Sequence, residues 1–157
     1  MATMNKAFMR EPDRSDEAHC PRCGSLGLPV GRETLQEFLT PEAMATVSET
    51  AFFCPFPTCE IVYFDVFDRT VGGRAVKRAI YPKDPGAPIC GCFGFKRDEI
   101  ELDVAEGVVN RCRELINKSK SPEAKCVIMS ADGRCCVSEV QRIFMKLRQA
   151  AEAARGP

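Results

Sequence analysis

The chain has 157 residues, 22 basic and 22 acidic side chains, and a formal net charge of zero. This balance argues against a general nucleic-acid or membrane-surface binder, because such proteins normally carry an excess of Lys and Arg. No run of residues approaches the roughly 18 apolar residues of a membrane span, and residues 1–14 lack the apolar stretch of a secretory signal. We therefore expect a cytoplasmic protein with no nucleic-acid and no membrane partner.

The first part of the sequence predicts an arm followed by a β-rich module. Residues 1–16 are polar and mixed in charge, which indicates a flexible arm, and residues 17–86 are predicted to form the module. Within it, His19 to Gly24 is a tight turn of the zinc-knuckle kind, and residues 26–34 can form a short strand. A helix is expected to start at Thr40-Pro41-Glu42, with an N-cap, a proline and an acid in its first turn, and to run to about Val47.

The strongest strand signal in the chain is residues 61–67, which are dense in β-branched and aromatic side chains. Gly72-Gly73 is then predicted to be a turn, and residues 74–81 the returning strand. The two prolines and the glycine between Pro82 and Pro88 indicate the boundary of the module.

Residues 87–157 are predicted to form a second, mostly helical module. Apolar residues at helical spacing indicate a helix over residues 97–117, which Gly107 is expected to split in two. A last helix is predicted to begin at Ser138, where Ser138-x-x-Gln141 has the pattern of a capping box.

Ten cysteines are the most informative feature of the composition. In a reducing cytosol, clustered cysteines favour metal binding or redox chemistry over structural disulfides. The chain has no Trp, 10 Phe and 2 Tyr, so two modules of this size would each have a marginal apolar core. Metal binding could supply the missing folding energy.

Four cysteines in the first module have the spacing of a closed metal site. The C-x2-C and C-x4-C pairs suit tetrahedral zinc in a ribbon-like fold, and a closed set of thiolates indicates a structural role. Iron in a rubredoxin-like site would use the same ligands, and His19 could replace one cysteine, although four cysteines make this the less favoured choice. The predicted zinc ligands are Cys20, Cys23, Cys54 and Cys59.

The cysteines of the second module have an unusual spacing. A single residue between two cysteines is rare for zinc but fits iron–sulfur ligation, and a loop with Gly91 and Gly94 can turn backbone amides toward a negatively charged cluster. The positive end of the last helix can also stabilise a thiolate or an anionic cluster. The expected 2Fe–2S ligands are Cys90, Cys92, Cys126 and one residue of the pair Cys135-Cys136, for which Cys136 is favoured.

A second zinc site is the alternative interpretation of this set. Two cysteines then remain outside the four expected ligands. Cys112 lies in the middle of a predicted helix and is most simply a buried small apolar residue. Cys135 is either an auxiliary thiol for a transferred soft metal or a bystander packed against the loop.

Several segments, in the same order along the chain, resemble the N-terminal domain of the CopZ copper chaperone family. They are Cys20-Pro21-x-Cys23-Gly24, Thr34-Leu35, Leu39 to Ala43, Phe53-Cys54 to Cys59, Val62-Tyr63-Phe64, Cys90-x-Cys92-Phe93-Gly94 and Gly133-x-Cys135-Cys136. The resemblance implies a zinc site in the first half, with the ligands named above, and a 2Fe–2S cluster on Cys90, Cys92, Cys126 and Cys136. The second half is also similar to the 2Fe–2S domain of bacterioferritin-associated ferredoxins.

The sequence departs from the family pattern at three places. Val127 follows Cys126 where family members often have C-x-C-E, and Ala131-Asp132 replaces the usual Asn-Pro. The further copper-binding domain with a C-x-x-C loop, which the chaperones of the family carry, has no counterpart in these 157 residues.

We therefore predict an α+β chain, with a zinc-ribbon-like β module and a short helix, followed by a small helical 2Fe–2S module. The resemblance implies an accessory protein for copper handling, in which the cluster donates an electron that reduces an incoming soft metal such as Cu(II) to Cu(I). Its expected partners are copper or another soft metal ion, and a redox or metal-transport protein.

Two other functions fit the same residues. One is an electron-transfer or redox-sensing 2Fe–2S protein that delivers no metal, and the other is a structural double-zinc interaction module. No acid–base constellation accompanies the cysteines, so we expect no ordinary enzyme, and metal-reducing activity is the one alternative left open.

Overall fold

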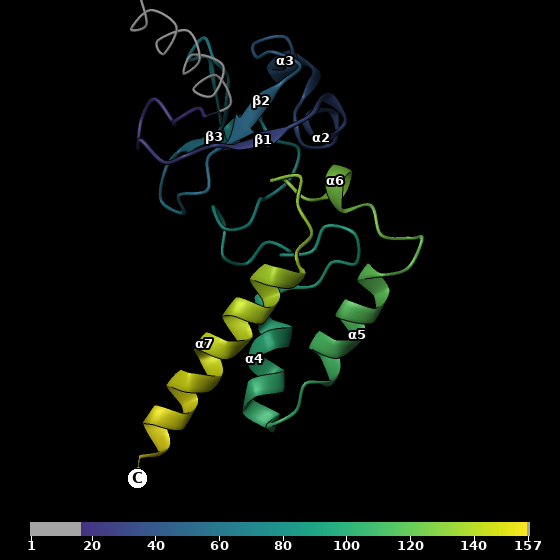
Figure 1. The fold of residues 1–157 in the computed structure, drawn as a ribbon. Helices are drawn as coiled ribbons and strands as arrows, with labels where there is room; N and C mark the ends of the chain where they lie inside the picture. Colours follow the sequence, from purple (N-terminus) through teal and green to yellow (C-terminus); the bar gives the residue numbers. More distant parts are fainter. Residues whose placement is uncertain (1–16, 157) are drawn as a thin grey trace, which may run out of the picture.

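The computed structural model describes residues 17–156, so the arm predicted at residues 1–16 lies outside the described residues. A four-stranded sheet with two short helices forms one half of the molecule, and helices alone form the other (Figure 1). The predicted α+β class is therefore confirmed. Over the described range, every helix is either too short or too polar to cross a membrane.

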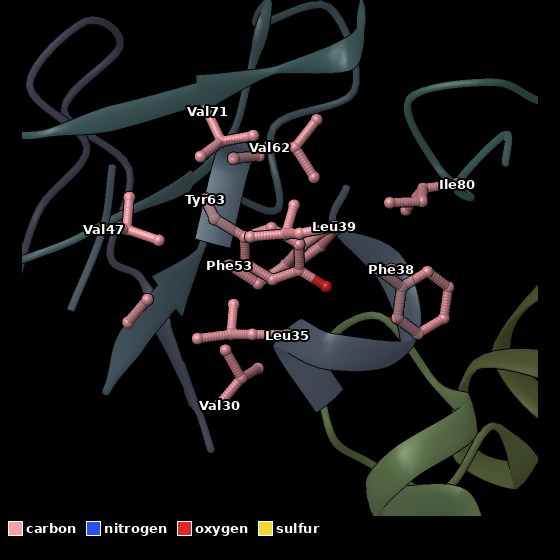
Figure 2. Close-up of a cluster of buried hydrophobic side chains, with 12 residues drawn as sticks. Val30, Leu35, Phe38, Leu39, Val47, Phe53, Val62, Tyr63, Val71 and Ile80 are labelled. Carbon is pink, nitrogen blue, oxygen red and sulfur yellow. The ribbon is translucent and has the colours of Figure 1, made fainter. Parts of the chain in front are cut away.

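The sheet is antiparallel throughout, with its strands side by side in chain order. Its central strands are buried on both faces. Phe53 and Tyr63 pack at 5.7 Å between ring centroids in the larger apolar cluster (Figure 2), whereas Phe52 and Phe64 lie in a second cluster with Cys20. The strands are β1 (Leu28–Val30), β2 (Ala51–Phe53), β3 (Ile61–Phe64) and β4 (Thr70–Gly72).

Two short helices, α2 (Arg32–Phe38) and α3 (Pro41–Met44), cover one end of the sheet. The strand predicted over residues 26–34 is too long, because α2 begins at Arg32 and buries Leu35 and Phe38 against the sheet. The predicted start of the following helix is confirmed: the Thr40 hydroxyl accepts a hydrogen bond from the amide of Ala43 at 3.2 Å.

The turn between β3 and β4 is built on the buried carboxylate of Asp65. Its oxygens accept hydrogen bonds from the amides of Phe67 at 2.9 Å, Arg69 at 3.1 Å and Ser48 at 3.0 Å. The chain therefore reverses directly after Phe64, and β4 is Thr70–Gly72.

The returning strand predicted at residues 74–81 is accordingly wrong. Gly72-Gly73 leads into the 3-10 turn η1 (Gly73–Ala75), and within residues 74–81 only Val76 makes an isolated bridge, to Leu39. The sheet is already complete before this segment begins, because the Asp65 turn brings β4 back earlier.

The helical half consists of α4 (Arg97–Glu106), α5 (Asn110–Ser119), the single-turn α6 (Cys126–Met129) and α7 (Val137–Arg155). Gly107 ends α4 with a φ of 70°, so the predicted split at this glycine is confirmed. The buried carboxylate of Asp103 then accepts hydrogen bonds from the amides of Arg111 and Cys112, at 3.3 and 2.9 Å. These two amides lie in the first turn of α5 and have no acceptor within the helix.

The last helix starts one residue earlier than predicted and lacks the predicted capping box. Cys136 is its N-cap, and the carbonyl of Cys136 accepts the first helical bond from Val140 at 3.0 Å. Ser138 is already inside the helix, so its side chain cannot serve as the cap.

Replacing Asp65 by Ala is expected to lower the free energy of unfolding by about 3 kcal/mol, because buried amides and Arg69 would lose their acceptor. Burial alone would raise the pKa of Asp65, but the amides of Ser48, Arg69 and Phe67 and the Arg69 side chain lower it below its ordinary value. This stabilisation is complete above about pH 4, the ordinary value, and is lost as the pH falls through the lowered native pKa. Urea unfolding at pH 7 and pH 3 measures both effects.

The control for this variant is Glu49→Ala, which removes an exposed partner of Arg32 nearby. It is expected to cost less than about 0.5 kcal/mol. An Asp65→Ala protein as stable as this control would contradict the role of the buried carboxylate.

Candidate metal centre

The sulfur atoms of four cysteines in the first half lie within 4.8 Å of one another. The Cys20 and Cys59 sulfurs are 3.9 Å apart, and the Cys23 and Cys54 sulfurs are 3.5 Å apart. A tetrahedral zinc ion with Zn–S bonds of about 2.3 Å separates its sulfurs by about 3.8 Å. The arrangement therefore fits one four-coordinate ion with no open position, and His19 lies outside this group.

Local backbone geometry makes the first half of this site. In the turn that carries Cys20 and Cys23, the amide of Gly24 donates to the Cys20 carbonyl at 2.9 Å, and the amide of Cys20 donates to the Ser25 carbonyl at 2.8 Å. Gly24 has a φ of 78°, which favours glycine. The turn then packs tightly on the sheet, because a Cβ at Gly27 would lie 2.5 Å from the Phe64 ring.

The second half of the site is attached to β3. The amide of Cys54 donates to the Val62 carbonyl at 2.9 Å, so the turn with Cys54 and Cys59 follows β2 directly and is bonded to β3. Lys83, from the segment after the sheet, donates to the carbonyls of Phe56 at 2.6 Å and Cys59 at 3.2 Å. This lysine places a positive charge beside the thiols.

Three of the four sulfurs interact with a backbone amide two residues further along the chain. The amides are those of Ser25, Phe56 and Ile61, and each of these contacts lowers the pKa of its thiol. Hydrogen bonds of this kind favour the thiolate, which is the form that binds a metal.

The thiols nevertheless differ in their ionisation. A hydrogen bond between the Cys23 sulfur and the Ser25 hydroxyl, at 3.2 Å, lowers the pKa of Cys23 to about 6. Burial raises the pKa of Cys54 to about 12 and also raises the pKa of Cys59. The exposed Cys23 is therefore a thiolate at neutral pH, whereas Cys54 and Cys59 hold their protons until a metal displaces them.

The second set brings together cysteines from three separate segments. Cys90 and Cys92 precede α4, Cys126 begins α6, and Cys135 and Cys136 precede α7. Over residues 17–156, the four thiols of the first set are the one group of three or more Cys, His, Asp or Glu ligand atoms that lie within 4.8 Å of one another. The second set is thus more widely spaced.

The pKa values of the second set show which of its thiols are neighbours. A hydrogen bond with the Cys136 thiol lowers the pKa of Cys90 to about 6, and the same contact with Cys90 raises the pKa of Cys136. Burial, together with the nearby thiols of Cys135 and Cys92, raises the pKa of Cys126 to about 12. All five sulfurs therefore belong to one neighbourhood.

Backbone amides point at these sulfurs, as the glycine-rich loop predicts. The amides of Phe93 and Cys92 bond to the Cys90 sulfur and lower its pKa, and the amide of Lys125 donates to the Cys92 sulfur at 3.3 Å. Cys136, as the N-cap of α7, stands at the positive end of the longest helix.

The residue between Cys90 and Cys92 has to be glycine because of a close contact. A Cβ at Gly91 would lie 1.9 Å from the carbonyl oxygen of Met129, so the loop rests directly on the backbone of α6. Sequence reasoning missed this contact, together with α6, Lys83 and Lys125, since each depends on residues distant in the chain.

Cys112 stands apart from both sets. It is buried in the helical core with Ile100 and Leu115, and burial raises its pKa to about 12. Its interpretation as a small apolar residue agrees with this position.

A cleft of about 520 Å³ opens between the sheet half and the helical half. Its lining is apolar at Phe38, Phe53 and Ile89 and charged at Arg78, Asp132 and Arg142. Cys135, which is exposed, and the buried Cys136 both line it, as does Met129. The cleft therefore connects the second cysteine set to solvent.

Comparison with known protein families gives a match for the first half of the chain. Residues 17–77 match the model of a family described as a zinc binding domain, zf_CopZ. Residues 17–77 therefore form a zinc-binding domain of the CopZ type, built around the four-cysteine site.

A longer similarity extends into the second half. The chain is 23% identical over 146 residues to the copper chaperone CopZ of Archaeoglobus fulgidus, an alignment that covers 87% of this chain and 66% of the relative. The chain thus spans just under two thirds of that protein's length. The crystal structure of the Archaeoglobus fulgidus CopZ N-terminal domain has the same fold, with a TM-score of 0.67 and 21% identity, covering 80% of this chain and 97% of that one.

Replacing Gly91 by Ala is expected to separate the Cys90–Cys92 loop from α6, because the new methyl group would collide with the Met129 carbonyl. The expected result is a several-fold faster reaction of Cys92 with a thiol reagent, located by mass spectrometry in metal-free protein. The control is Gly31→Ala, where a Cβ meets nothing within 4 Å. Equal reactivity of Cys92 in both variants would show that the loop does not depend on this contact.

Proposed function

We propose that this chain is an accessory protein for copper handling that holds one zinc ion and one 2Fe–2S cluster. Zinc would be held by Cys20, Cys23, Cys54 and Cys59, and the cluster by Cys90, Cys92, Cys126 and Cys136. The observation that carries the proposal is the gathering of a second thiol set, distinct in spacing from the first, in a chain similar to a copper chaperone.

The wider spacing of the second set supports a cluster rather than a second zinc ion. A cluster with two irons is held by two pairs of ligands, so its four sulfurs need not lie at tetrahedral distance. The Cys90 thiol has Cys136 and Cys92 as neighbours, and the Cys126 thiol has Cys135 and Cys92, so the set extends over two ends that Cys92 connects. Amides of Cys92, Phe93 and Lys125 directed at the sulfurs supply the hydrogen bonds that an anionic cluster needs.

Burial favours Cys136 over Cys135 as the fourth ligand. Cys136 is buried next to Cys90 and begins α7, whereas Cys135 is exposed on the cleft. We assign Cys135 as an auxiliary thiol for the incoming soft metal. Met129 lines the same cleft, and a methionine thioether is a sulfur donor of the kind that Cu(I) prefers.

When bound, a 2Fe–2S cluster supplies one electron, which would reduce Cu(II) to Cu(I), and a redox partner protein would restore that electron. The residues of this chain orient the sulfurs, exclude water from the buried Cys90 and Cys136, and admit the ion through the cleft. A metal-transport protein is the proposed recipient of Cu(I).

Zinc uptake by metal-free protein at pH 7 is expected to release at least two protons per ion, because the raised pKa values of Cys54 and Cys59 keep both thiols protonated until zinc binds. Titration with zinc in weakly buffered solution containing a pH indicator measures the release. Cys54→Ser should reduce it, whereas Cys112→Ser should leave it unchanged. Release of less than one proton would contradict the assignment of these two thiols.

Anaerobically purified protein is expected to contain about two iron, two sulfide and one zinc per chain, with the visible absorption of a 2Fe–2S cluster. After reduction, one equivalent of Cu(II) should reoxidise the cluster without releasing iron, and a Cu(I)-specific chromophoric chelator should detect one Cu(I). Cys126→Ser should lose the cluster, and Cys112→Ser should retain it.

The alternatives correspond to other results of the same experiment. A cluster that cycles reversibly but is not oxidised by Cu(II) would indicate electron transfer without metal delivery. Colourless protein with two zinc ions would contradict the cluster and indicate a structural double-zinc module.

A further inference from the structure

The segment that joins α5 to α7 contains three of the five cysteines near the second site but little structure of its own. It has one turn of helix, α6, and Val127 on that turn is 65% exposed. Cys126 begins α6, and Cys135 and Cys136 end the segment. Some other part of the molecule must therefore hold it in place.

Two buried hydroxyl groups of the zinc-binding domain provide that support. The Thr34 hydroxyl, on α2, donates to the carbonyl oxygen of Val127, and the Tyr63 hydroxyl, on β3, donates to the carbonyl oxygen of Ala131 at 2.6 Å. Both donors are almost completely buried, with 1% and 0% of their surface exposed. Bonds from such donors are costly to break, because the hydroxyl groups left behind would be buried without a partner.

Packing strengthens the same attachment. Ala131 packs against the apolar cluster that contains Tyr63 (Figure 2), and a Cβ at Gly133 would lie 3.5 Å from the Val30 side chain. Burial raises the pKa of Tyr63 above its ordinary value, so its hydroxyl keeps its proton and remains a donor at neutral pH.

The attachment reaches the remaining cysteines through α6. The Gly91 backbone rests on the Met129 carbonyl, and the amide of Lys125 donates to the Cys92 sulfur. In the other direction, Tyr63 lies on the strand to which the Cys54 amide is bonded. A continuous series of contacts thus links the first thiol site, β3, the α6 segment and the second set.

We infer that Thr34 and Tyr63 are positioning residues for the second cysteine set, and that metal occupancy of the first site controls how tightly the second set is held. Loss of zinc would loosen β3, release the segment at residues 126–134 and separate Cys126 from Cys90 and Cys92. Where this concerns a cluster, it rests on the proposed function, but the positioning itself does not.

The test compares Tyr63→Phe and Thr34→Val with two matched controls in the full chain. The controls are Tyr81→Phe, whose hydroxyl bonds Glu139 at 3.3 Å, and Thr46→Val, whose hydroxyl bonds the Ala43 carbonyl at 2.7 Å. Neither control residue bonds to residues 126–134. Hydrogen exchange of zinc-loaded, iron-free protein should be about tenfold faster over residues 126–134 in the two test variants, the effect of losing one buried hydrogen bond.

Amides of β2 and β3 should exchange at the wild-type rate in Tyr63→Phe, which separates positioning from general unfolding. Unchanged exchange over residues 126–134 in both test variants would overturn the inference, whatever the state of the second site. Zinc removal by a chelator, and separately Cys23→Ser, should accelerate exchange over the same segment. Equal exchange rates with and without zinc would overturn the inference that metal in the first site determines how tightly the second set is held.

Iron release to a chelator provides the readout for the cluster. Release should be several-fold faster from Tyr63→Phe than from Tyr81→Phe, and equal rates would overturn the role of Tyr63 in holding the cluster. If wild-type protein binds no iron, the proposed function fails, while the exchange measurement still decides the positioning role.

Discussion

Two hydroxyl groups on buried residues of the sheet half, Thr34 and Tyr63, donate to backbone carbonyl groups of the segment between α5 and α7, and these bonds join the two halves of the molecule. The sheet half has an apolar cluster around Tyr63, and the helical half has a separate cluster around Ile100 and Val140. Each cluster is small for an independent domain. The segment between α5 and α7 touches both, because Thr34 and Tyr63 donate to two of its carbonyl groups while Cys136, at its end, belongs to the helical cluster. The structure thus has these two apolar clusters, and the segment between α5 and α7 contacts both of them.

The features of the fold that the sequence predicts correctly are local ones. Thr40 caps a helix with the amide three residues ahead, and Gly107 ends a helix through its own backbone conformation. The Asp65 turn could not be predicted in the same way, because one of its donors is Ser48, which lies on a different segment. The sequence around Asp65 gives no indication that its carboxylate is buried and accepts several hydrogen bonds.

The same distinction separates the two cysteine sets. Cys20 and Cys23 share one short turn, and so do Cys54 and Cys59, so their spacing suffices to predict that each pair of sulfurs converges. The second set has no such local origin, since its geometry depends on α6 lying under Gly91 and on α2 lying beside α6. Spacing indicated which thiols to consider, but only tertiary packing determines which of them are neighbours.

The closed thiolate site also changes the electrostatic character of the chain. Four thiolates around one divalent ion leave an excess of about two negative charges, so the zinc-loaded chain is more negative than its formal charge of zero and than the metal-free chain, in which Cys54 and Cys59 are still protonated. That charge cannot be buried completely, because Cys23 is exposed while Cys20 and Cys54 are not. Metal loading should therefore lower the isoelectric point and favour the approach of cations over that of anions.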